Sequence, residues 1–370
     1  MKYRIHAMHG FLPLYDTRGA RALDARATEL LGGDGYVLMQ RAGRAAWRHL
    51  AQSWPTARRL CVVCGPGNNG GDGYVLAHLA RKAGLGVKVL HLAEHVPATP
   101  LAQRACTEYV AAGGAIGLFP EEWPQGDVVV DALFGIGLAR APDAFAAALI
   151  DAVNAQPAPV FAMDVPSGLD ADLGSSPGKS IVADAALQFI ARHAGLHTGQ
   201  ALEHTGALAL DDLEVPPEAY GAALPVATLL TVDALPNWLF PRRRNRHKGE
   251  SGRVLGIGGD HGSGGAIVLC AEAALRSGAG LVDVATRELH VPVVLARRPE
   301  VMAHGIESGE DLEPLLSRAG AIGIGPGLGQ GEWGKAMLRL ALASQNPLVL
   351  DADALNFLAA APRVLTDAIL

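Results

Sequence analysis

The sequence predicts two α/β domains, each a doubly wound αβα arrangement around a mostly parallel sheet. Strand-like apolar runs alternate with helix-like runs along both halves of the 370 residues, and this alternation is typical of parallel sheets covered on both faces. Glycine-rich turns follow several of these runs, at the sheet edge where such folds bind ligands. The chain is too long for one ordinary core, so we expect domains at residues 1–222 and 223–370, joined by a Pro- and Ala-rich linker around 215–245.

Composition and charge exclude several classes of protein. A net charge of −6 does not fit the basic footprint of a nucleic-acid binder. No charge-free run approaches the roughly 20 residues of a membrane helix, and the N-terminus lacks an apolar signal core. Four cysteines do not make a disulfide framework. The sequence therefore predicts a cytoplasmic, enzyme-like protein without nucleic-acid or membrane partners.

Cys61 and Cys64 have a spacing that can indicate a metal or redox site, but they lie in a strand-like run. A three-residue offset puts them on opposite faces of a strand. We expect buried apolar cysteines.

The elements of the first half follow from apolar patterning. Residues 16–53 predict two helices, and further helices are expected at Tyr74–Ala83 and Pro142–Asn154. Four apolar runs predict the strands Leu60–Cys64, Gly86–Leu90, Asp127–Asp131 and Pro159–Asp164.

The second half repeats the alternation with a helix at Gly264–Ser277. Its strands are expected at Arg253–Gly258, Gly280–Thr286, Gly320–Gly325 and Leu348–Asp351. The basic run 242–248 before them has two interpretations, a solvated linker or interface rim, or a phosphate-facing loop that begins at Lys248.

The segment Cys64–Gly73 is the strongest functional signal. Five of its ten residues are glycine, and it separates a predicted strand from a predicted helix. Glycines let backbone N–H groups point into one concavity, and a helix N-terminus adds partial positive charge. Asn68, Asn69 and Asp72 add polar groups that turn formation does not require. The segment predicts an anion or phosphate site.

Asp131 and Asp164 end two further predicted strands, so they fall on the same sheet edge as the glycine-rich segment. Each could instead cap the next helix, but three polar features at one edge favour a site. Such a carboxylate can exchange protons with a substrate hydroxyl. Oxygens of Asn69, Asp131 and Ser167 could also hold a hard cation, and their low charge suits a monovalent ion.

Seven motifs resemble a known family in order and spacing. CGPGNNGGDGYV at 64–75, VDALFGIGL at 130–138 and DVPSG at 164–168 resemble the Rossmann-like NAD(P)H-hydrate epimerase domain. KGESGRVLGIGG at 248–259, GAGLV at 278–282, GIGPGLG at 323–329 and LDADALN at 350–356 resemble the ribokinase-like NAD(P)H-hydrate dehydratase domain. The domain order is that of the fused bacterial enzyme of cofactor repair.

The resemblance implies a set of site residues. Asp164 would contact the substrate and transfer the proton, and Asn69, Asp131 and Ser167 would hold a potassium ion. The hydrated dinucleotide would lie against Asn68, Asn69, Gly70, Gly71, Asp72, Gly135, Ile136, Gly137, Leu138, Ala139, Arg140, Ala141 and Asp164 in the first domain and Ala266 and Gly327 in the second.

The resemblance also implies an activity in metabolite repair. The first domain would interconvert the (R) and (S) forms of NADH hydrate and NADPH hydrate. The second would dehydrate the S form with ADP or ATP, accompanied by magnesium, and a homo-oligomer is expected. The rival interpretations are a non-catalytic dinucleotide-binding or scaffold module and a ribokinase-like small-molecule kinase.

One departure concerns the second domain. The family's H-P-G-E motif, its K-G-A-G-T-like nucleotide loop and its G-G-M-G-D motif do not occur after Asp353. The resemblance thus implies an incomplete ribokinase-like domain, from a truncated copy, a fragment or an incomplete reading. If Leu370 ends the protein, dehydration is expected to fail.

Overall fold

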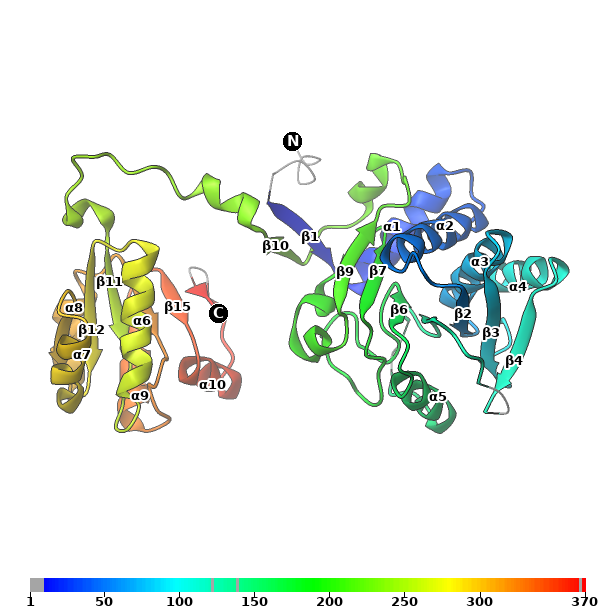
Figure 1. The fold of residues 1–370 in the computed structure, drawn as a ribbon. Coiled ribbons are helices and arrows are strands. Elements are labelled where there is room, and N and C mark those ends of the chain that lie inside the picture. The colour runs from blue at the N-terminus through cyan, green and yellow to red at the C-terminus, as the bar shows by residue number, and fades with distance from the viewer. Residues whose placement is uncertain (1–9, 121–122, 138–139, 366–367) are drawn as a thin grey trace. The chain divides into compact units, whose positions relative to one another are not determined.

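Two parallel sheets organise the chain into the units Met1–Leu239 and Phe240–Leu370 (Figure 1). The computed structural model describes residues 10–120, 123–137, 140–365 and 368–370. Within these residues, both units are α/β, which confirms the predicted fold class.

The sheet of the first unit has seven strands, and every pairing in it is parallel. The chain runs outward from the centre in both directions, so the order reverses between the neighbours β2 and β5. Ligands bind at such a switch point in doubly wound folds. In sheet order the strands are β4 (Ala115–Phe119), β3 (Gly86–Leu92), β2 (Arg59–Cys64), β5 (Val128–Ala132), β6 (Val160–Met163), β7 (Ala185–Phe189) and β9 (Ala207–Asp211).

Helices cover both faces of this sheet with separate apolar cores. One core includes Leu23, Tyr36 and Tyr74, and the other includes Leu149 and Ile150. The first core is formed by α1 to α4 and the second by α5, with bounds α1 (Thr17–Leu30), α2 (Tyr36–Ser53), α3 (Asn68–Lys82), α4 (Pro100–Ala111) and α5 (Ala144–Asn154).

The two cysteines of the C-x-x-C spacing belong to different cores. Cys64 packs in the first and Cys61 in the second, and both are fully buried. The prediction of buried residues on opposite faces of β2 is confirmed.

Helix α3 corrects the prediction for the glycine-rich segment. The helix begins at Asn68, six residues before the expected start at Tyr74. The loop is therefore only Gly65–Gly67, and the remaining glycines lie inside a helix.

Close packing explains why a helix contains these glycines. A Cβ on Gly70 would lie 2.0 Å from the carbonyl oxygen of Gly65, and one on Gly71 would lie 2.4 Å from Cε of Met39. Glycine costs about 1 kcal/mol in a helix interior, and here it lets α3 approach the loop and α2 without a clash.

A third, small sheet belongs to the first unit. It has the order β10 (Ala227–Leu230), β1 (Phe11–Tyr15), β8 (Arg192–His193), with β1 antiparallel to β10 and parallel to β8. This pairing ties residues 227–230 to the first unit, and the two units meet at 239/240. The sequence-based boundary at 222/223 precedes β10 because no local pattern reveals its pairing with β1.

The second unit has a six-stranded sheet in which every pairing is parallel. Its order also reverses, between β11 and β14. The strands are β13 (Met302–Gly305), β12 (Leu281–Thr286), β11 (Arg253–Ile257), β14 (Ala321–Ile324), β15 (Leu348–Leu350) and β16 (Ala368–Ile369).

Helices again cover both faces of this sheet. Ile267 and Val294 pack in one core, and Leu312, Met337 and Ala354 in the other. The helices are α6 (Gly264–Ser277), α7 (Val291–Arg297), α8 (Gly309–Leu316), α9 (Glu332–Ala343) and α10 (Asp353–Ala360). All strands predicted from the sequence in both halves are present.

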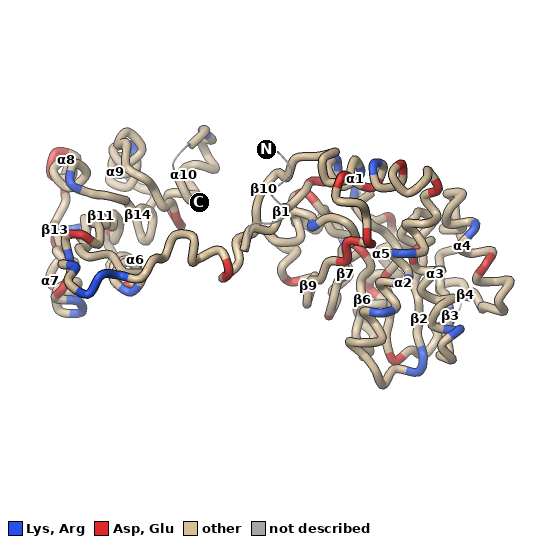
Figure 2. Tube along the Cα trace, turned by 90° about the horizontal axis from the view of Figure 1, so that it is seen from above, with Lys and Arg blue, Asp and Glu red and all other residues tan. Residues whose placement is uncertain are grey.

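The basic run 242–248 is exposed throughout and contributes a blue stretch of tube in Figure 2. This exposure agrees with a solvated segment. No helix among the described residues combines the length and apolarity needed to cross a membrane.

Candidate active site

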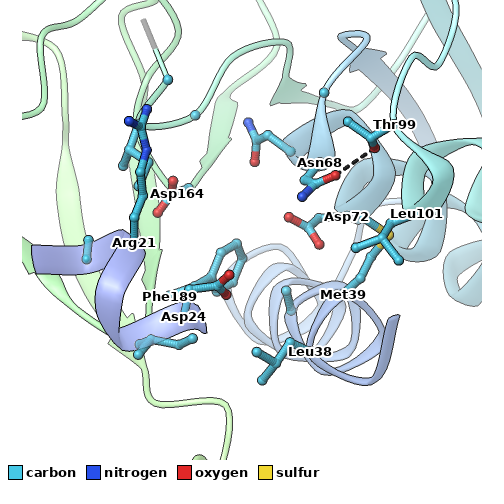
Figure 3. A pocket seen from close by; sticks show the side chains of 18 of the residues that line it. Arg21, Asp24, Leu38, Met39, Asn68, Asp72, Thr99, Leu101, Asp164 and Phe189 are labelled. Carbon is cyan, nitrogen blue, oxygen red and sulfur yellow. Dashed lines mark hydrogen bonds between the residues drawn. The ribbon is translucent and has the colours of Figure 1, made fainter. Parts of the chain in front are cut away.

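A cavity of about 980 Å³ opens beside the switch point of the first unit (Figure 3). Its walls come from α1, α2, the first turn of α3, the start of α4, the loop after β5 and the ends of β6 and β7. The volume is at the upper end of the range of about 300–1,000 Å³ for small-molecule sites. The cavity therefore lies where the sequence predicts a ligand.

Most of the predicted ligand-binding residues of the first unit line this cavity. Those that do are Asn68, Asn69, Asp72, Gly135, Ile136, Gly137, Arg140 and Asp164.

Three predicted residues are not part of the cavity wall. Gly70 and Gly71 pack inside α3 as described above, and Ala141 instead lies close to Gly178, with 3.1 Å between its Cβ and the position of a Cβ there. Leu138 and Ala139 lie outside the described residues.

Asn68 is held at the cavity wall by Thr99, the residue before α4. The Thr99 hydroxyl donates to Oδ1 of Asn68 over 2.6 Å and also accepts from the N–H of Ala102 at 3.2 Å, as the cap of α4. Figure 3 shows the first contact as a dashed line. One threonine thus caps a helix and orients a candidate ligand contact.

Asp164 enters the cavity from a sharp turn after β6. Its φ of 65° is in the left-handed region, which Asp tolerates better than most residues. Its N–H donates to the carbonyl of Leu187 on β7 over 2.8 Å. Its Oδ1 lies 3.1 Å from Nε2 of His193, so the carboxylate has a fixed neighbour as well as cavity exposure.

Asp131 lies behind the cavity wall, not on it. It is 1% exposed, and its carboxylate accepts from Ser167 N at 2.8 Å, Ser167 Oγ at 2.6 Å and Leu133 N at 3.1 Å. The sequence places Asp131 at the same sheet edge as Asp164, but these donors hold its carboxylate beneath the turn and away from the cavity wall. Burial raises its pKa to about 6, against the lowering effect of the Ser167 hydrogen bonds.

Asn69 connects this buried group to the cavity. Its Nδ2 donates to the carbonyl of Phe134 at 2.9 Å, and Ser167 Oγ also lies 3.2 Å from that carbonyl. Oδ1 of Asn69 is buried without a hydrogen-bond partner among the described residues. A side chain with an unpartnered buried oxygen, linked through the Phe134 carbonyl and the Ser167 hydroxyl to the Asp131 carboxylate, suits a hard cation.

Two further carboxylates face the cavity, on α3 and α1. Burial and the charges of Asp164 and Asp24 raise the pKa of Asp72 well above its ordinary value. Burial and the charge of Asp164 also raise the pKa of Asp24. Figure 3 shows Asp72 and Asp164 directed into the same space from different elements.

Sequence reasoning missed several residues of the cavity wall. Arg21 and Asp24 are three residues apart and share one face of α1. This spacing predicts a polar face on the helix, but it does not show that the face lines a cavity. Phe189 and His193 carry no local signal, because the pairing of β7 with β6 and of β8 with β1 brings them to the cavity.

In the second unit the structure brings the two predicted residues together. A Cβ on Gly327 would lie 3.2 Å from Cβ of Ala266, and Gly327 has a φ of 60° that favours glycine. The loop after β11 joins this cluster, since the N–H of Asp260 donates to the Gly327 carbonyl at 2.6 Å. The cluster lies at the β11/β14 switch point, as expected for a ligand site in this fold.

Family models match both units. Residues 35–195 match the model described as YjeF-related protein N-terminus. Residues 254–369 match the model described as NAD(P)H-hydrate dehydratase.

Similar proteins match along most of the chain. The bifunctional NAD(P)H-hydrate repair enzyme Nnr of Escherichia coli K12 is 44% identical over 340 residues, which cover 92% of this chain and 66% of that protein. The enzyme of the same name from Coxiella burnetii is 43% identical over 358 residues, covering 96% and 73%. The chain thus spans about two thirds of the length of these relatives.

The fold of the first unit also has a solved counterpart. The crystal structure of the yeast protein YNL200c aligns with a TM-score of 0.50 and 20% identity, covering 60% of this chain and 98% of that one. From the two family models and the relatives that match along most of its length, the chain belongs to the family of bifunctional NAD(P)H-hydrate repair enzymes.

Proposed function

We propose that the first unit interconverts the (R) and (S) hydrates of NADH and NADPH. The observation that carries this proposal is the cavity at the β2/β5 switch point, into which Asp164 projects beside Asn68 and Gly135. The names of the similar proteins supply the substrate class.

In this proposal Asp164 is the general acid–base. It exchanges a proton with the ring hydroxyl as that group leaves and returns. Asn68 and the loop at Gly135 bind the dinucleotide and so hold the nicotinamide ring at the carboxylate. Cavity walls from α1 and α2 limit the access of water to the reacting ring.

We also propose a potassium ion held by Asn69, Asp131 and Ser167. Support comes from the buried, unpartnered Oδ1 of Asn69 and from the oxygen-only character of the donors. When bound, the ion supplies positive charge that offsets the buried carboxylate of Asp131. The three residues would then fix the loop after β5 against α3.

For the second unit we propose participation in dehydration of the S hydrate with ADP or ATP and magnesium. The family model matched at residues 254–369 supports this assignment. Ala266 and Gly327 would lie against the hydrated cofactor. A cytoplasmic location and a homo-oligomeric state stay predictions from the sequence.

The epimerase proposal is tested with purified protein and resolved (S)-NADPH hydrate, following formation of the R form by chromatography. Asp164→Asn should nearly abolish epimerisation while NADPH-hydrate binding remains measurable by thermal shift, since ligand at 100 times its Kd adds about 2.7 kcal/mol. Asp151→Asn, on the exposed side of α5, is the matched control and should be fully active. An Asp164→Asn variant with full activity would remove Asp164 from the mechanism.

A further inference from the structure

We infer that His193 is a positioning residue for Asp164 in the proposed epimerisation, and that it acts through the Nε2–H group of its ring. This inference rests on the proposed function of the first unit. It concerns a residue that the motifs of the sequence do not mark, delivered to the cavity by β8 of the small sheet.

Strand β7 accepts a hydrogen bond from the backbone of Asp164 and one from the backbone of His193. The N–H of Asp164 donates to the carbonyl of Leu187, and the N–H of His193 donates to Oε1 of Gln188 over 2.7 Å. Leu187 and Gln188 are consecutive on β7, and the Gln188 side chain is buried. The spacing between Asp164 and His193 is therefore set by the main sheet, with little freedom to drift.

The side chains then meet in a defined way. Nε2 of His193 lies 3.1 Å from Oδ1 of Asp164, and the two side chains are 2% and 16% exposed. Next to a carboxylate oxygen, Nε2 carries the hydrogen and donates it. This bond fixes Oδ1, and Oδ2 is left on the side of Gly135, where a Cβ would lie 3.0 Å from it.

The other ring nitrogen argues against a purely structural histidine. Nδ1 of His193 is buried and has no hydrogen-bond partner among the described residues. Buried polar atoms that serve only the fold are nearly always satisfied. The contact with Asp164 is thus the polar contact that orients this ring, and it in turn holds the Asp164 carboxylate in place in the cavity.

Positioning by a neighbouring imidazole has a clear chemical use here. A carboxylate that must give a proton to one ring hydroxyl and take it back works best with one oxygen held and the other directed at the substrate. Without the donor, the Asp164 side chain can rotate about its χ angles, and the reactive oxygen moves away from the ring. The loss should fall on kcat and leave substrate binding nearly unchanged.

Two isosteric substitutions test the inference with the full chain and (S)-NADPH hydrate. The amide nitrogen of His193→Gln can occupy the position of Nε2, whereas that of His193→Asn reaches only the position of Nδ1. We expect His193→Asn to lower kcat about 100-fold, the cost of a misplacement near 1 Å, with KM unchanged. His193→Gln should restore most of kcat. Equal activity of His193→Asn and wild type, or equal losses in the two folded variants, would overturn the inference.

A second measurement covers the case in which His193→Asn does not fold. Ring ¹⁵N NMR of the wild-type protein should show hydrogen on Nε2 of His193, and this preference should be lost in Asp164→Ala. A dominant Nδ1–H tautomer in wild type would overturn the inference. An inactive wild-type protein overturns the proposed function itself, whereas an active wild type with a fully active His193→Asn overturns the positioning role alone.

Discussion

The carboxylate of Asp164 lies close against the position that a side chain on Gly135 would occupy. A Cβ at that position would lie 3.0 Å from Oδ2 of Asp164 and 3.4 Å from Cβ of Asn69. The loop after β5 therefore passes close to Asp164, the proposed acid–base, and to Asn69, a proposed cation ligand. A substitution at Gly135 therefore tests how far Asp164 can be displaced before epimerisation slows.

Gly135→Ala should lower epimerisation by displacing Asp164. Residue 135 is not in the left-handed region, so the methyl group acts through contact and not through backbone strain. A contact at 3.0 Å requires the carboxylate to move by a few tenths of an ångström, so we expect kcat to fall about 10-fold, less than the roughly 100-fold cost of a 1 Å misplacement. The measurement is steady-state epimerisation together with the midpoint of thermal unfolding.

Gly86→Ala, at the start of β3 and outside the cavity wall, is the matched control for this change. A Cβ there would meet Cγ of Arg59 at 3.6 Å and the carbonyl oxygen of Arg58 at 3.7 Å, both ordinary contacts, so activity should stay close to that of wild type. Equal effects of the two substitutions would show that contact with Asp164 is not what Gly135 provides.

The sequence predicts the central strands of both sheets because each is a short apolar run. It does not predict β1, β8 and β10, because their pairing joins segments about 180 and 215 residues apart that have no common local pattern. The same long-range pairing hides the boundary between the units.

The sequence places Asn69 and Asp164 at one sheet edge for a sound physical reason, the shared end of parallel strands. It cannot separate Asp164, which projects into the cavity, from Asp131, which turns inward to Ser167. That difference depends on the φ angle of 65° at Asp164 and on the hydrogen bonds that Ser167 donates to Asp131. His193 was missed because nothing near it in sequence suggests a partner for a carboxylate.

The glycines inside α3 should be needed for stability. Gly70→Ala puts a methyl group 2.0 Å from the Gly65 carbonyl oxygen, and overpacking of this kind costs about 3 kcal/mol. At Gly67, the N-cap of α3, a Cβ meets nothing within 4 Å, so Gly67→Ala should cost about 1 kcal/mol or less. Urea unfolding of the two variants measures the difference, and similar midpoints would contradict the packing explanation of the glycine-rich segment.

Potassium should stabilise the first unit in a way that depends on Asn69 and Ser167. At equal ionic strength, potassium chloride should raise the unfolding temperature relative to choline chloride, because an ion that binds only the folded state stabilises it. Asn69→Ala and Ser167→Ala should lose this increase. Ser176→Ala, whose hydroxyl contacts Ser180 and the Gly178 carbonyl, is the control and should keep it. If wild type responds equally to both salts, the residues do not hold potassium.

Asp283 should dominate the acid sensitivity of the second unit. Burial alone would raise its pKa, but hydrogen bonds from Arg253 and His304 and the charges of Arg253 and Arg318 outweigh burial and lower the pKa below 3.8. His304 Nε2 lies 2.9 Å and Arg318 Nη2 3.1 Å from Oδ1. A carboxylate with a lowered pKa stabilises the fold at every pH above 3.8, and this contribution is lost as the pH falls through the folded-state pKa.

Asp283→Asn should therefore destabilise the second unit at pH 7 by about 3 kcal/mol, the low end for a broken buried pair because its arginine partners are partly exposed. The difference from wild type should stay nearly constant down to pH 4 and shrink below it. Hydrogen exchange of β12 peptides during urea unfolding reports on this unit alone. Glu332→Gln removes an exposed pair with Lys335 and should change stability by less than about 0.5 kcal/mol at any pH. If the difference in stability between Asp283→Asn and wild type stays unchanged down to pH 2, packing and not the charge of the carboxylate explains the effect of the substitution.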